Sequence, residues 1–175
     1  MLLASAALFS FMDLTLASPS SDVLNCDFNR TYCALGHGAG WTFGVADITP
    51  TYQLPYVRFT SDEKSNRTYI NSANLNFNDT ICFEFSYRAS ATNVYPINIY
   101  AAIDVAQPYG TRVIYNANVT ASNPGTSEWT TAQIDIKPMP VNSWLMFDVF
   151  TGPSVGETID VARFYAKDGI CYCEN

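Results

Sequence analysis

Apolar and polar residues alternate with a period of two along this chain, and beyond residue 17 no stretch repeats with the period of an amphipathic helix. Such alternation turns successive side chains to opposite faces of a strand. The clearest runs are 81–87, 97–104, 133–137 and 144–149, and turn-forming clusters lie at 61–65, 123–126, 137–140 and 151–154. Many short strands between regular turns predict an all-β fold, an antiparallel two-sheet jelly-roll sandwich of the concanavalin type.

The run 81–87 indicates which face of that strand is buried. Phe83, Phe85 and Tyr87 alternate with polar residues, so their aromatic face is predicted to be core. No linker, repeat or low-complexity block divides the 175 residues, a length that suits one domain.

Residues 1–17 are predicted to be a secretory signal peptide. The stretch from Leu2 to Phe9 is apolar and small residues lie near Ala17, although Asp13 interrupts the pattern and a buried helix is the alternative. We expect a short N-terminal segment at 18–25, a domain at 26–173, and a secreted, extracellular product. No other stretch approaches the ~20 apolar residues of a membrane span, and no hydrophobic C-terminal tail suggests a lipid anchor.

The charge balance argues against nucleic acid as a partner. The formal net charge is −7, which phosphate backbones repel. Charged residues make up only 14% of the chain and aromatic residues equal them at 14%, as suits a β-rich, tyrosine-rich domain.

Five cysteines in a secreted chain predict a disulfide framework with one thiol left over. Cys26 and Cys33 are close enough to close a short loop. Cys82 with either Cys171 or Cys173 would tie the middle of the domain to its end. A zinc site is disfavoured, because the chain has no C-x-x-C motif and a single histidine.

N-glycosylation is predicted in the secreted product. The sequence has four N-x-T sequons, each at an expected strand edge or turn where a glycan could project into water: Asn29, Asn66, Asn78 and Asn118.

The sequence nominates no catalytic residue and no cofactor. The stretch 152–156 matches the G-x-S-x-G elbow of hydrolases, but a strand is predicted after it and His37 lies far upstream, so it is interpreted as a turn. A glycosidase is disfavoured because no strand presents two carboxylates at i and i+2. We therefore predict that the chain is not an enzyme.

Three further residues are candidates for ligand contacts. His37, between two glycines, is expected on a solvent-facing loop. Trp41 and Trp129 could line a sugar platform. Core packing is favoured for Trp41, which begins an apolar run, and the exposure of Trp129 is left open.

An ordered set of motifs resembles the MAM domain family, the extracellular module of meprin-type proteases, neuropilin-like receptors and adhesive receptor phosphatases. It comprises Cys26-Asp27-Phe28, Cys33, Gly40-Trp41, the Cys82 strand, Trp129, the 145–150 strand, the 159–164 strand and Gly169-Ile170-Cys171. The resemblance implies a two-sheet jelly roll, disulfides Cys26–Cys33 and Cys82–Cys171, and protein–protein adhesion.

The chain departs from that family pattern at two places. Some members bind a cation through an acid after the opening motif and two aspartates in the closing strand. Here Asn29 and Val161 stand instead beside Asp160, so we expect no metal site, and whether a degenerate one remains at Asp160 is left open. Cys173 is extra. We expect it (or Cys171, if the pairing is swapped) to link a homodimer or a partner, with a small-thiol cap as the alternative.

The function predicted from the sequence is therefore a secreted, non-catalytic recognition and adhesion module. It would contact extracellular or cell-surface proteins and could self-associate. The alternative is a carbohydrate-binding, lectin-like β-sandwich, because tyrosine and tryptophan rings can stack on sugar faces.

Overall fold

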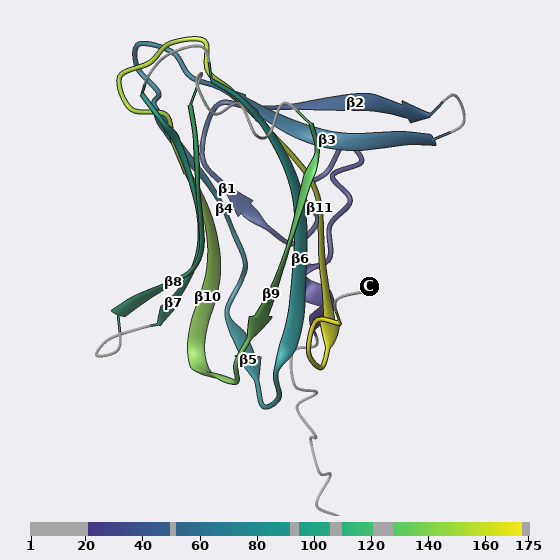
Figure 1. Cartoon of the computed structure of the whole chain (residues 1–175). Helices are drawn as coiled ribbons and strands as arrows, with labels where there is room; N and C mark the ends of the chain where they lie inside the picture. Colours follow the sequence, from purple (N-terminus) through teal and green to yellow (C-terminus); the bar gives the residue numbers. More distant parts are fainter. Residues whose placement is uncertain (1–20, 50–51, 92–94, 106–109, 121–127, 173–175) are drawn as a thin grey trace, which may run out of the picture.

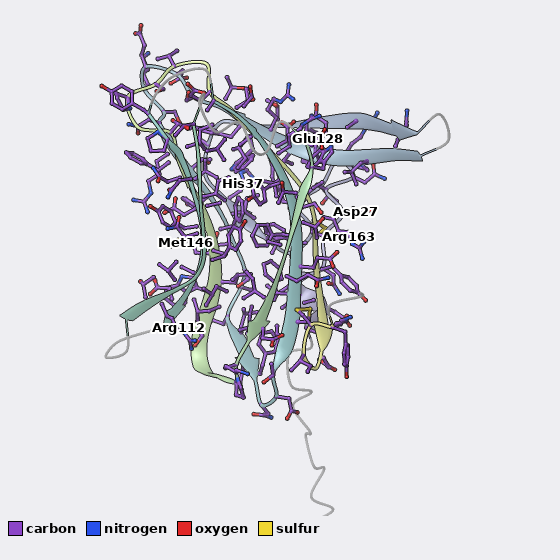
Figure 2. All side chains as sticks on the ribbon, viewed as in Figure 1. Asp27, His37, Arg112, Glu128, Met146 and Arg163 are labelled. Carbon is purple, nitrogen blue, oxygen red and sulfur yellow. A yellow bond between two sulfur atoms is a disulfide. The ribbon has the colours of Figure 1, made fainter. Side chains whose placement is uncertain are left out.

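A computed structural model describes residues 21–49, 52–91, 95–105, 110–120 and 128–172. Two antiparallel sheets pack face to face with the core between them, and side chains from both fill the space (Figures 1 and 2). The predicted fold class is confirmed: the chain is an all-β jelly-roll sandwich with two disulfides. The predicted signal peptide and Cys173 lie outside the described residues.

One sheet follows the order β1-β4-β10-β7-β8 with β5 beside β10, and the other follows β2-β3-β11-β6-β9. Most neighbouring strands are distant in sequence, as the crossovers of a jelly roll require. The strands are β1 (Gly36–His37), β2 (Trp41–Thr49), β3 (Tyr52–Thr60), β4 (Arg67–Asn71), β5 (Leu75–Phe77), β6 (Ile81–Ser90), β7 (Ile97–Val105), β8 (Gly110–Val119), β9 (Thr130–Ile136), β10 (Met139–Phe150) and β11 (Thr158–Asp168).

Aromatic rings from both sheets meet in the core. Phe83 and Phe85 of β6 are fully buried, as the alternation predicted, and Phe85 meets Phe147 of the opposite sheet edge-to-face at 5.3 Å. Tyr87 and Tyr115 share a 2.6 Å hydroxyl hydrogen bond. Burial, followed by this bond, raises the pKa of Tyr87 far above the usual tyrosine value.

The segment before the first cysteine belongs to the packed structure. A short 3₁₀ helix, η1 (Ser21–Leu24), buries Leu24 completely. Asn25 accepts a hydrogen bond from the Ala166 backbone at 2.6 Å, and Cys26 pairs with Phe164 through two backbone bonds. Residues 21–25, the described part of the segment 18–25 that was expected to precede the domain, thus contribute to its core.

Two disulfides cross-link the sandwich, and they join the same pairs of cysteines that the family resemblance implies. Cys26–Cys33 spans 7 residues, and Cys82–Cys171 spans 89, joining β6 to the segment after β11. Separately, no helix among the described residues is long and apolar enough to cross a membrane.

The two disulfides should differ in their effect on stability. A cross-link that closes a longer loop removes more entropy from the unfolded chain. We expect Cys82→Ala/Cys171→Ala to lower the free energy of unfolding by about 4.5 kcal/mol, and Cys26→Ala/Cys33→Ala by about 2.5 kcal/mol. Urea denaturation of both double variants checks the order, which equal losses would contradict.

Candidate binding site

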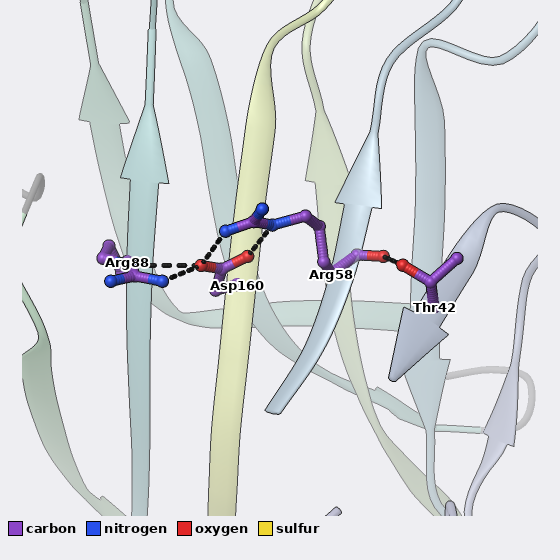
Figure 3. A network of polar contacts seen from close by, with 4 residues as sticks. All are labelled: Thr42, Arg58, Arg88 and Asp160. Carbon is purple, nitrogen blue, oxygen red and sulfur yellow. Dashed lines mark hydrogen bonds and ion pairs between the residues drawn. The ribbon is translucent and has the colours of Figure 1, made fainter. Parts of the chain in front are cut away.

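Three charged side chains form a row across neighbouring strands of the five-stranded sheet. Asp160 of β11 lies opposite Arg58 of β3 on one side and opposite Arg88 of β6 on the other (Figure 3). The flanking residues Val57 and Phe59 are fully buried, so alternation places Arg58 on the outer face. The row therefore crosses the face of the sheet that is turned away from the core.

The two arginines enclose the Asp160 carboxylate. Arg58 donates from Nε to Oδ1 at 2.6 Å and from Nη2 to Oδ2 at 2.8 Å, and Arg88 donates from Nε and Nη2 to Oδ2 at 3.0 and 2.5 Å. Asp160 is 1% exposed, whereas the arginine side chains are 39% and 29% exposed. The hydrogen bond to Asp160 raises the pKa of Arg58, despite opposing desolvation.

A pocket of about 340 Å³ opens beside this row. It is lined by Arg58, Arg88, Asp160, Ser90 and Thr158, and the last two are register partners next to the charged row. Their short hydroxyl side chains leave space beside the guanidinium groups. The volume falls within the ~300–1,000 Å³ of small-molecule sites.

Two aromatic rings hold the guanidinium groups. Arg88 lies 4.9 Å from the ring centroid of Trp129, and Tyr56 lies 5.4 Å from Arg58 and 5.8 Å from Arg88. A Cβ at Gly44, opposite Tyr56, would overlap the tyrosine ring, so glycine is what allows that ring to lie there. Cation–π contacts with these rings restrict the arginine conformations.

The other nominated residues lie away from this pocket. His37 is exposed as expected, although in β1 instead of a loop, and its ring stacks on Tyr32 with centroids 3.8 Å apart. Trp41 packs against Phe59 at the core edge and donates from Nε1 to the Tyr69 carbonyl. The elbow-like stretch 152–156 is a loop followed by β11 and has no helix after it.

All four sequon asparagines are exposed. Three lie in turns or between strands, and the fourth lies near the end of β8: Asn29, Asn66, Asn78 and Asn118.

The cation ligands of the resembled family have a different arrangement in this chain. Both oxygens of Asp160 accept from arginine, and Asn29 donates its backbone N–H to Asp27. No cluster of three or more His, Cys, Asp or Glu occurs in the described part of the chain. Arg58 and Arg88 supply the positive charge that Asp160 requires.

Sequence reasoning did not nominate Arg58, Arg88 or Tyr56. The available signal was a single aspartate within the otherwise apolar stretch 159–162, since a charge there needs a partner. The identity of that partner depends on which strands are neighbours, and the sequence alone does not show this.

No protein-family model matches the chain, and no curated protein matches it by sequence. Several solved structures share its fold. The K1 cleaved adhesin domain of Lys-gingipain from Porphyromonas gingivalis W83 has a TM-score of 0.62 at 15% identity over 83% of this chain and 98% of that chain. TmCBM61, solved with β-1,4-galactotriose, has a TM-score of 0.55 at 14% identity over 77% and 87%.

An α-L-arabinofuranosidase, MgGH51 with bound arabinose, also matches. Its TM-score is 0.53 at 12% identity over 84% of this chain, which spans only 25% of the length of that enzyme chain. At these identities the likeness shows the fold alone.

Neutralising Asp160 should destabilise the sandwich more than neutralising Asp148. Asp160→Asn leaves two partly buried guanidinium groups without their carboxylate, and we expect a loss of about 2–4 kcal/mol in the free energy of unfolding. The matched control is Asp148→Asn, whose partner Arg67 is 62% exposed, with an expected loss of about 1 kcal/mol or less. Urea denaturation compares them, and a larger loss for the Asp148 variant would refute this view of the row.

Proposed function

We propose that this chain is a secreted, non-catalytic recognition module that binds glycans at the pocket formed by Arg58, Arg88 and Asp160. The observation that carries the proposal is the pocket itself, which is lined by polar groups and whose two arginines pack against the rings of Tyr56 and Trp129. Sugars present both hydroxyl groups and apolar ring faces, so such a combination of side chains suits them.

The chemistry of the pocket supports binding more than catalysis. Two-carboxylate glycoside hydrolysis needs a second acid within about 10 Å of the first. Asp160 is the one carboxylate among the described residues that line the pocket, and both its oxygens accept hydrogen bonds from arginine. A carboxylate held in this way is poorly placed to act as nucleophile or acid.

The solved structures that share the fold support the same proposal by analogy. One of them is a carbohydrate-binding module in complex with a galactotriose, and another is an adhesin domain. The fold is thus compatible with glycan recognition. Because one fold hosts many functions, the proposal depends on the residues of the pocket. Secretion agrees with the two disulfides, which persist in oxidising compartments.

A second candidate function is protein–protein adhesion of the MAM type. The β2–β3 hairpin extends beyond the rest of the sandwich (Figure 1), and β2 forms an edge of its sheet. On this strand Phe43 and Val45 share one face and are 42% and 52% exposed. An exposed apolar edge strand can add a strand from another protein.

A glycan array with the secreted protein tests the first function. We expect binding to a defined set of glycans, and a loss of at least about tenfold in affinity for Arg88→Ala and Trp129→Ala, because the first removes a side chain that lines the pocket and the second removes the ring that packs against that side chain. The matched control is Arg112→Ala, an exposed arginine on β8 of the other sheet (Figure 2), which should bind like the unmodified chain.

Circular dichroism of each variant separates loss of binding from loss of fold. If the protein bound no glycan on the array, or if the Arg112 control lost as much affinity as the pocket variants, glycan binding at this pocket would be contradicted. Binding to a cell-surface protein that Phe43→Ser abolishes and Arg88→Ala spares would favour the adhesive alternative.

A further inference from the structure

We infer that the pocket selects sugars that carry an oxyanion, a carboxylate or a sulfate, over their neutral counterparts. The inference rests on the proposed glycan binding and names the ligand class of the same site. Its basis is that positive charges outnumber negative charges, and hydrogen-bond donors outnumber acceptors, around Asp160.

The charged row has an excess of one positive charge. Arg58 and Arg88 contribute two guanidinium groups, and Asp160 is the one acid among the described residues that line the pocket. The acids that adjoin the site in sequence are Glu128, exposed beside Trp129, and Glu157, which is buried and already engaged in an interaction. In a chain of net charge −7, this pocket is a local site of positive charge.

The pocket also contains more donors than acceptors. A guanidinium group has five N–H donors and no acceptor. The bonds to Asp160 use Nε and Nη2 of each arginine, and no described group accepts from Nη1 of either. Because Asp160 accepts four hydrogen bonds and is 1% exposed, it offers a ligand little acceptor capacity.

A neutral sugar hydroxyl must both donate and accept, whereas an oxyanion only accepts. The remaining N–H groups of two arginines therefore suit a carboxylate or sulfate better than a hydroxyl. The hydroxyl groups of Ser90 and Thr158 can donate to the same anion, because they line the pocket beside the guanidinium groups.

The arginines are also ordered before a ligand arrives. Asp160 holds both guanidinium groups from one side, and the rings of Tyr56 and Trp129 pack against them. A preorganised donor set loses little conformational freedom on binding, which favours affinity for a ligand of matching charge.

The experiment compares ligands that differ only in charge. Trigalacturonic acid is measured against its methyl ester, 3′-sialyllactose against lactose, and lactose 3′-sulfate against lactose, by titration calorimetry at 50 mM and 500 mM NaCl. We expect the acidic member of at least one pair to bind at least about tenfold more tightly at low salt, and this preference to shrink at high salt. The pairs distinguish a carboxylate from a sulfate.

Four variants locate the preference. Arg58→Gln and Arg88→Gln should reduce the acid-to-neutral ratio of affinities toward one, whereas Arg88→Lys should keep part of the preference and Arg112→Gln should keep all of it. Equal affinity for acidic and neutral members would overturn the inference and leave glycan binding standing. The absence of binding to every glycan on the array would overturn the proposed function itself. Equal binding of poly-glutamate would overturn selection of a sugar and indicate an acidic protein partner.

Discussion

The ion pairs of Asp160 with Arg58 and Arg88 are the constraint on which the candidate site depends. A carboxylate that is 1% exposed is costly unless it is paired and hydrogen-bonded, and both arginines meet it in register. A slip of one residue between β3, β11 and β6 would turn Asp160 away from its partners and bring it toward the core. The row therefore favours one register at the centre of the sheet and fixes the walls of the pocket at the same time.

Strand β11 combines this polar row with the aromatic core by means of a β-bulge. Asp160 and Phe164 are four residues apart, so strict alternation would place both on the same face. The register shifts between Ala162 and Phe164, and Arg163 adopts a positive φ of 45°. The extra residue reverses the alternation, so that Asp160 faces outward while Phe164 packs against Phe83 at 5.4 Å.

The sequence could predict the buried face of a single strand, but not the contacts between strands that are distant in sequence. Alternation within one strand is local, so the core face of β6 with Phe83 and Phe85 could be predicted from its pattern. The pocket could not, because Asp160 is 102 residues from Arg58 and 72 from Arg88 in sequence. Their meeting depends on the strand order β3-β11-β6, which no local signal encodes. The contribution of Leu24 escaped prediction for the same reason, since its core contacts are formed by tertiary packing.

The polar row is weak evidence for stability alone, because a buried ion pair is often no more stabilising than apolar residues of similar volume. What distinguishes this row is the pocket of about 340 Å³ beside it, which is lined by both arginines, while two aromatic rings pack against their guanidinium groups. Glycan recognition and adhesion then need not be alternatives. A module that binds an acidic sugar displayed on a neighbouring protein would adhere through that sugar, while the exposed edge of β2 would remain available for contact with the protein beneath it.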